Sequence, residues 1–318
     1  MSSWLKSAGL ALLAAGWLVA GAPAPANAFE AITGDGGGGS DVPSGSSGGN
    51  AGGGGAGSGP SADTDTRLAE AAQRYEQAVG VVVISGPRVG PIPTGTAWAI
   101  ADGTFVTNAH VVEGVRKALT SKHIEAAFIA INKRPDLRLR IRSMTAHPRH
   151  GDVETDFEGT RSIGHSYDVG LLRTDGSAPV AFKLAPKSDL LALRAGERVA
   201  YLGFPMENLT AGNVNVRHPV ATMQSGIITA VTDYWQKNQD PANAHFVRHN
   251  LGAAGGASGS PMFNADGEVV SVLSGGNNFA GVVIEVQGGK LNKEIQRVGN
   301  AAMVNFAQRA DLIHDLLR

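Results

Sequence analysis

The feature that most constrains this chain is a series of short apolar or alternating runs, separated by Gly, Pro, Asn and Asp, that recurs from about residue 61 to the end. Such runs, in the absence of long segments with helical periodicity, are typical of antiparallel β architectures. The segment 61–318 is long enough for two small β-rich lobes, each with its own core. The pattern therefore predicts an all-β protein with two antiparallel lobes.

The predicted elements follow the chain in order. A short helix from about Asp63 has an apolar face, and we expect it to pack on the first lobe. The strands expected in the first lobe are 81–84, 95–100, 104–107, 126–131, 137–146 and 169–173. Those expected in the second lobe are 196–205, 220–225, 226–232, 244–249, 262–264, 268–274 and 282–286. A short amphipathic helix is expected at about 310–318, and 287–302 fits none of these elements.

The N-terminal part of the chain is typical of an exported protein. Residues 1–28 combine Lys6, an apolar run at 8–22 and a small-x-small cleavage site, which predicts a signal peptide. The apolar run is shorter than a membrane-spanning helix requires, so we expect cleavage before Phe29 and no stable membrane span afterwards; an uncleaved anchor is the alternative. Residues 29–60, rich in Gly and Ser, predict a disordered linker, or else a spacer from the cell envelope. With no cysteine and hence no disulfides, the chain is compatible with a periplasmic or secreted location.

The segment 255–261, Gly-Gly-Ala-Ser-Gly-Ser-Pro, contains a candidate nucleophile. Small neighbours on both sides leave the Ser258 hydroxyl open to a substrate. They also allow the backbone N–H groups of Gly256 and Ser258 to converge, as an oxyanion hole requires. The alternative interpretation is an ordinary Gly/Ser turn between strands.

Two upstream residues are candidate partners for Ser258. A serine hydroxyl needs a positioned base, and that base needs an acid to fix its tautomer. His110 follows two predicted strands within Phe-Val-Thr-Asn-Ala-His-Val-Val, and Asp168 lies in Ser-Tyr-Asp-Val-Gly-Leu-Leu. Taken singly, each could equally be a surface or capping residue.

Together these motifs resemble the chymotrypsin-fold serine proteases. The segments Gly-Thr-Ala-Trp, Thr-Asn-Ala-His-Val-Val, Tyr-Asp-Val-Gly-Leu-Leu and Gly-Ala-Ser-Gly-Ser-Pro are most similar to the bacterial, cysteine-free branch that includes the high-temperature-requirement proteases. The order His, Asp, Ser agrees with that superfamily. The resemblance implies a protease domain at 61–318 made of two six-stranded barrels, at about 79–190 and 194–309. It also implies a final strand at 303–307, with 287–302 as an insertion relative to the family pattern. Those proteases usually continue into PDZ modules, which we do not expect here.

The resemblance also implies how substrate is bound. Ser274, Gly275 and Gly276 would form the edge that pairs with an extended polypeptide. The pocket for the residue before the scissile bond would lie between that edge and a wall formed by Gly252, Ala253, Ala254 and Gly255. Because no acid occupies position 252, we expect a preference for small or medium aliphatic residues, unless Glu285 faces inward.

Other partners are not indicated. His147, His150, Asp152 and His165 lack a periodicity that would aim them at one metal ion. Arginines alternate with apolar residues along 137–142, which is typical of a solvated strand face, and the net charge of −1 argues against nucleic acid. We expect no cofactor, and the oligomeric state stays open.

The sequence therefore predicts an exported serine endopeptidase with His110, Asp168 and Ser258 as its triad. Two alternatives remain: a catalytically inactive protease-fold module that binds extended segments in the manner of a chaperone, and an esterase that uses the same triad.

Overall fold

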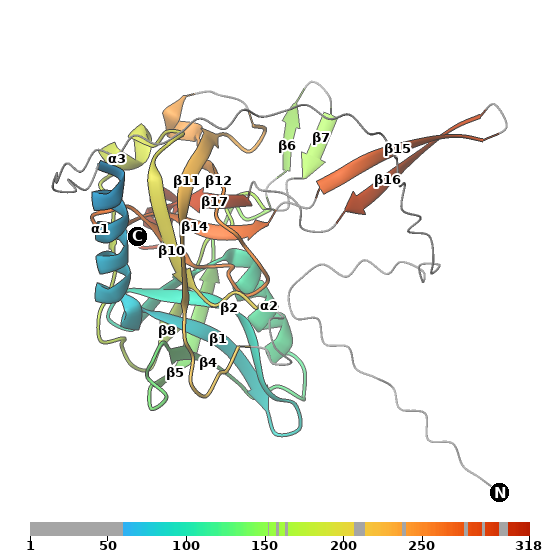
Figure 1. The fold of residues 1–318 in the computed structure, drawn as a ribbon. Coiled ribbons are helices and arrows are strands. Elements are labelled where there is room, and N and C mark those ends of the chain that lie inside the picture. The colour runs from blue at the N-terminus through green and yellow to red at the C-terminus, as the bar shows by residue number, and fades with distance from the viewer. Residues whose placement is uncertain are drawn as a thin grey trace, which may run out of the picture.

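The computed structural model describes residues 60–318, apart from 152, 157–158, 163–164, 207–213, 237–239, 277–278, 288–289 and 299–304. The predicted signal peptide and all but the last residue of the predicted linker lie outside these ranges. Two barrels dominate the described chain, with barrel two above barrel one in Figure 1.

Barrel one is closed and antiparallel, with the strand order β1-β2-β3-β8-β5-β4. Its strands are β1 (Val79–Gly86), β2 (Gly90–Ala101), β3 (Thr104–Thr107), β4 (Ala126–Ile131), β5 (Arg138–Ala146) and β8 (Gly170–Thr174). Period-two alternation explains these strands: along β5 the arginines are exposed, whereas Leu139 and Ile141 are buried in the core. All six strands agree with the sequence prediction.

One helix lies across barrel one and carries the candidate base. Helix α2 (Ala109–Leu119) buries Val111, Val112 and Val115 against β5, β8 and β2. Gly170 allows this close packing, because a Cβ there would lie 2.7 Å from a methyl group of Val112. The N-terminal end of α2 is thus held at the start of β8, where Asp168 lies two residues upstream.

Barrel two also has six strands in a closed ring. They are β10 (Arg198–Gly203), β11 (Thr222–Thr232), β12 (Phe246–His249), β13 (Pro261–Phe263), β14 (Glu268–Gly276) and β17 (Asn305–Arg309). The order is β13-β10-β11-β12-β17-β14, and pairing of β13 with β14 closes the ring. A further short strand, β9 (Lys183–Leu184), joins β14 in parallel. The predicted fold class, two six-stranded antiparallel barrels, is confirmed.

One predicted strand boundary in barrel two is wrong. Residues 220–225 and 226–232 are not two strands, because β11 runs without a break through Gly226, which pairs with Val199 of β10. Gly226 is needed for packing and makes no turn: a Cβ at this position would lie 2.3 Å from Oδ1 of Asn250.

The remaining elements surround the two barrels. They are α1 (Pro60–Arg74), η1 (Glu76–Ala78), α3 (Lys187–Ala192), η2 (Pro241–Asn243), the 3₁₀ helix η3 (Ala310–Asp315), and the hairpins β6 (Val153–Asp156) with β7 (Gly159–Ser162) and β15 (Phe279–Gln287) with β16 (Lys290–Val298). Strand β16 lies in the segment 287–302 that the sequence left without an assignment. The short C-terminal helix expected at about 310–318 is present as the 3₁₀ helix η3.

Helix α1 packs on barrel two, so the expectation that it covers the first lobe was wrong. It contacts β10 and β11 and runs alongside β10 in Figure 1, with Leu68 and Ala71 buried. The β13–β14 turn accepts this helix because Gly267 has no side chain; a Cβ there would lie 2.8 Å from the ring of Tyr75. The apolar face of α1 is a local property, but its packing partner depends on the tertiary fold.

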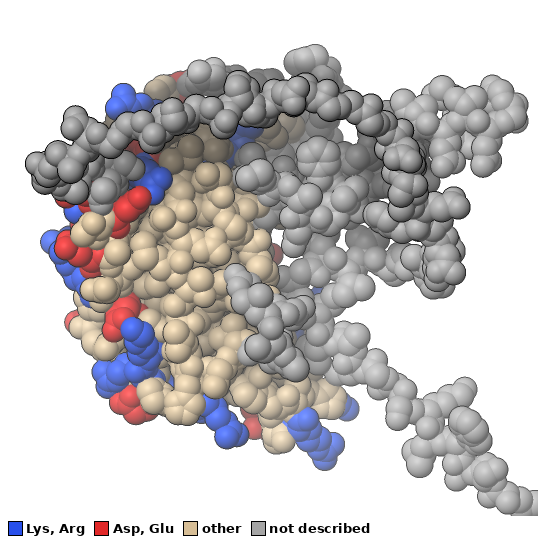
Figure 2. Space-filling model, in the orientation of Figure 1, with Lys and Arg blue, Asp and Glu red and all other residues tan. Residues whose placement is uncertain are grey.

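The surface in view carries no dominant charge. Acidic and basic side chains are mixed along the margins beside α1 and the loops of barrel one, and the centre of the described face is mostly uncharged (Figure 2). Among the described helices, none has the length and apolarity needed to cross a membrane.

Candidate active site

His110 lies in the first turn of α2 and makes a two-point contact with Asp168. The Nδ1 atom of His110 lies 2.8 Å from Oδ2 of Asp168, and the backbone N–H of His110 donates to Oδ1 at 2.9 Å. Asp168 is fully buried, whereas the His110 side chain is 29% exposed. The carboxylate therefore fixes both the imidazole ring and the start of the helix that carries it.

The two groups shift each other's pKa in opposite directions. Burial alone would lower the pKa of His110, but the charge of Asp168 and its hydrogen bond outweigh that effect, so the pKa of His110 is raised. Burial would likewise raise the pKa of Asp168, but the charge and hydrogen bonds of His110 hold it below its ordinary value. At neutral pH the acid is thus ionised beside an imidazole of increased basicity.

Asn108, which the sequence analysis did not single out, supports this pair. Its Nδ2 donates to the backbone carbonyl of Asp168 at 2.8 Å and to Oγ of Ser274 at 3.2 Å. It is fully buried and directly precedes α2. The available signal was its place two residues before His110 in the Thr-Asn-Ala-His motif.

Ser258 lies on a turn of barrel two that is bound to barrel one. The backbone N–H of Thr96 in β2 donates to the carbonyl of Ser258 at 2.8 Å, and Oγ1 of Thr96 donates to the carbonyl of Gly256 at 2.8 Å. The turn depends on glycine at two positions: Gly256 and Gly259 both have φ +88, and a Cβ would lie 2.4 Å from the Phe204 carbonyl and 2.2 Å from the Thr96 carbonyl, respectively.

The hydroxyl of Ser258 points to β14. It donates to the carbonyl of Ser274 at 3.2 Å, and within the described part of the chain no hydrogen bond joins it to His110. The structure therefore brings His110 and Asp168 into direct contact, and it brings Ser258 to the same seam with its hydroxyl turned toward the predicted substrate-binding edge.

The predicted oxyanion donors have no competing acceptor among the described residues. No such residue accepts a hydrogen bond from the backbone N–H of Gly256 or of Ser258. The carbonyl of Gly256, by contrast, is held by Thr96. An amide that is free beside a fixed carbonyl is suited to receive a developing negative charge.

The two predicted walls of the substrate pocket lie on neighbouring parts of barrel two. On one side, the carbonyl of Gly252 accepts from Tyr201 at 3.0 Å, and a Cβ at Gly252 would lie 2.8 Å from Oε1 of Gln224. The wall continues through Ala253, Ala254 and Gly255. On the other side, Gly275 and Gly276 pair with Phe306 and Asn305 of β17. Asn305 links the two sides, because its Nδ2 donates to the carbonyl of Leu251 at 2.6 Å.

The histidines considered for a metal site have different surroundings. His150 lies with Nε2 at 3.8 Å from Oδ1 of Asp168, and His147 stacks on Tyr167 with ring centroids 5.3 Å apart. His165 lies against Phe306, and burial lowers its pKa. Among the described residues, no cluster of three or more His, Cys, Asp or Glu side chains could hold a metal ion. Asp152 lies outside the described residues.

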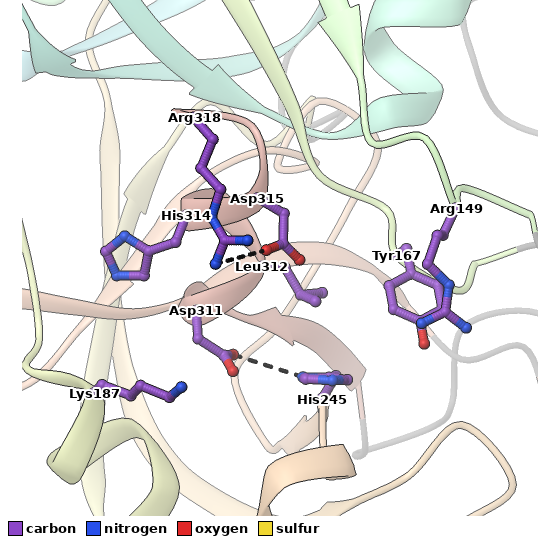
Figure 3. A pocket seen from close by; sticks show the side chains of 9 residues that line it. All are labelled: Arg149, Tyr167, Lys187, His245, Asp311, Leu312, His314, Asp315 and Arg318. Atoms are coloured by element: carbon purple, nitrogen blue, oxygen red, sulfur yellow. Dashed lines mark ion pairs between the residues drawn. The ribbon is translucent and has the colours of Figure 1, made fainter.

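A separate cavity of about 320 Å³ lies beside Tyr167, the residue before Asp168 (Figure 3). Tyr167 lines it, with the guanidinium of Arg149 4.0 Å from the ring centroid. The other lining residues are Lys187, His245, Asp311, Leu312, His314, Asp315 and Arg318. Neither His110 nor Ser258 lines this cavity, so the candidate chemistry lies elsewhere, on the seam between the barrels.

Comparisons with known proteins agree with this fold. A curated relative described as a probable periplasmic serine endoprotease DegP-like, from Halomonas elongata, is 27% identical over 181 residues, which cover 57% of this chain and 29% of the relative. Human serine protease HTRA4 is 24% identical over 229 residues, which cover 67% and 40% of the two chains. The chain thus spans less than half the length of either relative.

Solved structures with a similar arrangement include two proteases. The active form of the Rv3671c protease from M. tuberculosis has 16% identity, coverage of 78% of this chain and 82% of that one, and a TM-score of 0.46. The HtrA-type protease AlgW with a tripeptide has 20% identity, coverage of 79% and 62%, and a TM-score of 0.46.

Residues 95–272, more than half of the sequence, match the family described as "Trypsin-like peptidase domain". The chain belongs to this family of trypsin-like peptidase domains.

Proposed function

We propose that the protein is an exported serine endopeptidase in which Ser258 is the nucleophile, His110 the base and Asp168 the orienting acid. The observation that carries this proposal is the two-point contact of the buried Asp168 with His110, which leaves Nε2 of the imidazole as the proton acceptor. A buried carboxylate that raises the basicity of a partly exposed histidine matches the requirement for activating a serine.

The reaction begins when the Ser258 hydroxyl leaves the Ser274 carbonyl and turns to His110. An extended substrate that pairs with β14 through its backbone N–H groups competes for that same carbonyl, so substrate binding favours the release of the hydroxyl. His110 takes the proton as Ser258 attacks the scissile carbonyl, and the N–H groups of Gly256 and Ser258 stabilise the oxyanion. His110 then protonates the leaving amine, and water repeats the cycle on the acyl-enzyme.

The proposed substrates are extended polypeptides with a small or medium aliphatic residue before the scissile bond. Position 252 carries no acid. The side chains nearest to Gly252, Gly255 and Gly275 are those of Gln224, Met206 and Phe306, and none of these is charged. We place the protein in the periplasm or outside the cell, as the N-terminal 28 residues indicate. A peptide library tests the specificity, and a strong preference for Arg or Lys would overturn it.

The test of the catalytic proposal is labelling with a fluorophosphonate, followed by turnover of casein and of small esters. We expect the wild type to be labelled, and Ser258→Ala, His110→Ala and Asp168→Asn to lose labelling and turnover. An unlabelled but folded wild type would support the inactive binding module. Labelling with ester turnover but no casein turnover would support the esterase.

A further inference from the structure

The residue before Asp168 has an uncommon backbone conformation. Tyr167 has φ +52, in the left-handed region that bulky residues seldom adopt. Such conformations persist only where surrounding contacts hold them, and they gather at functional sites. Because Tyr167 and Asp168 share a peptide unit, whatever holds Tyr167 also sets the direction of the Asp168 side chain.

We propose that Tyr234 and Gln308, both contributed by barrel two, are positioning residues for Asp168, and that they act through a buried hydrogen-bond relay to the segment 165–167. This proposal rests on the proposed function, in which Asp168 is the orienting acid. Neither residue touches His110 or Ser258 through a hydrogen bond in the described part of the chain.

The relay begins and ends in the same short segment. The backbone N–H of Tyr167 donates to the hydroxyl of Tyr234 at 2.8 Å, and that hydroxyl donates to Oε1 of Gln308 at 2.7 Å. Nε2 of Gln308 then donates to the carbonyl of His165 at 2.9 Å. Because Tyr234 has one proton and Gln308 one acceptor oxygen, each link orients the next, and the three bonds form one unit.

The three side chains of Tyr167, Tyr234 and Gln308 are buried, which shields the first two bonds of the relay from water. Gln308 is 0% exposed, and Tyr167 and Tyr234 are each 7% exposed. Loss of one partner would leave buried polar groups unsatisfied, which destabilises the arrangement more than a surface hydrogen bond would. Burial also raises the pKa of the Tyr234 hydroxyl well above its usual value, so it keeps its proton as the donor to Gln308.

Other contacts hold the far side of the same segment. Asn108 donates to the carbonyl of Asp168, and both carboxylate oxygens of Asp168 are engaged by His110. The ring of Tyr167 lies under the guanidinium of Arg149 in Figure 3. The contacts to Asp168 itself come from barrel one, whereas the relay reaches the preceding backbone from barrel two. The proposed acid is therefore fixed only when both barrels are in place.

The test compares Tyr234→Phe and Gln308→Met, singly and together, with Tyr75→Phe as the matched control. Tyr234→Phe keeps the ring and removes only the hydroxyl. Tyr75 stacks on Phe182 and makes none of the three hydrogen bonds of the relay. We expect each relay variant to lower kcat about ten-fold with KM changed less than about two-fold, because Asp168 is displaced while the substrate edge is intact. The double variant should be no worse than the stronger single one.

The pH profile separates positioning from simple destabilisation. In the wild type Asp168 raises the pKa of His110, so a displaced Asp168 raises it less, and the acid limb of kcat moves to lower pH in Tyr234→Phe. Glu113, His150 and His165, the other groups that act on His110 or Asp168, are unchanged in this variant. Thermal unfolding of each variant gives the folded fraction at every pH.

The outcomes distinguish the two proposals. A folded wild type that neither reacts with fluorophosphonate nor hydrolyses peptide overturns the proposed function. A wild type that does both, with Tyr234→Phe unchanged in kcat, overturns only the relay. A loss of kcat with an unmoved acid limb, or additive losses in the double variant, also overturns the relay, because either result indicates general destabilisation.

Discussion

Barrel one and barrel two share a strand number and a closed shape, but they supply the site in different ways. Barrel one contributes His110 and Asp168, which contact each other directly beside α2 and β8. Barrel two contributes Ser258 on a turn whose carbonyls are held by Thr96 of the other barrel. Both members of the base–acid pair thus come from one barrel, whereas the turn that carries the nucleophile is held in place by hydrogen bonds across the seam.

Among the variants proposed here, Asp168→Asn in barrel one is expected to lower kcat the most. It should lower kcat about 10³- to 10⁴-fold, because an amide of the same shape cannot hold the required tautomer of His110. Asp175→Asn is the matched control: Asp175 also accepts from a backbone N–H, that of Arg140, but at an exposed position. Steady-state kinetics and thermal unfolding check this prediction, and less than a ten-fold loss of kcat in Asp168→Asn would contradict it.

Thr96→Val tests the seam. Oγ1 of Thr96 donates to the Gly256 carbonyl and accepts from the N–H of Phe204, so its loss leaves buried polar groups unpaired on the barrel-two side. We expect the free energy of unfolding to fall by about 2 kcal/mol, and the rate of Ser258 labelling to fall about ten-fold. Thr94→Val, which loses a bond within barrel one, should leave the labelling rate nearly unchanged. Equal effects on the labelling rate in Thr96→Val and Thr94→Val would contradict the claim that hydrogen bonds across the seam position Ser258.

The pH dependence isolates the base–acid pair. The base must be neutral, and the pKa of His110 is raised above the ordinary value of 6.5. We therefore expect kcat/KM to rise about ten-fold per pH unit until the pH reaches the pKa of His110. The same raised pKa means that the charged pair contributes stability below the ordinary imidazole pKa, and that this stability is lost as pH rises through the raised value. Rate and unfolding measurements between about pH 5 and 9 check both, and a flat rate there would exclude His110 as the base.

The smallest change in the free energy of unfolding is expected for the ion pair between α1 and the surface of barrel two. Arg67 of α1 pairs with Asp266, but the two side chains are 45% and 65% exposed, so Arg67→Ala should change the free energy of unfolding by less than about 1 kcal/mol. Its neighbour Leu68 is fully buried, and Leu68→Ala should destabilise by about 2–4 kcal/mol. Urea unfolding of both variants tests whether apolar packing or charge holds α1 on barrel two.

Most strands could be predicted from the sequence because their signals are local. The six strands of barrel one follow from alternation and turn residues. The crowding that requires glycine at 256 and 259 does not, because it comes from the carbonyls of Phe204 and Thr96, which are distant in the sequence. The candidates His110 and Asp168 were identifiable from motifs next to two separate predicted strands, 104–107 and 169–173. Asn108 and Thr96 were missed, since a buried amide or hydroxyl beside a strand has no distinctive local pattern.

Local residue patterns were thus sufficient for the all-β class, and the family resemblance of the motifs added the two barrels and the proposed catalytic residues. Closure of the barrels decided the rest: the packing of α1 on barrel two, the unbroken β11, the turn of the Ser258 hydroxyl toward Ser274, and the relay through Tyr234 and Gln308. The reason is physical. Alternation acts over neighbouring residues, whereas the relay joins groups 67, 74 and 143 residues apart, whose hydrogen bonds form only after both cores have excluded water.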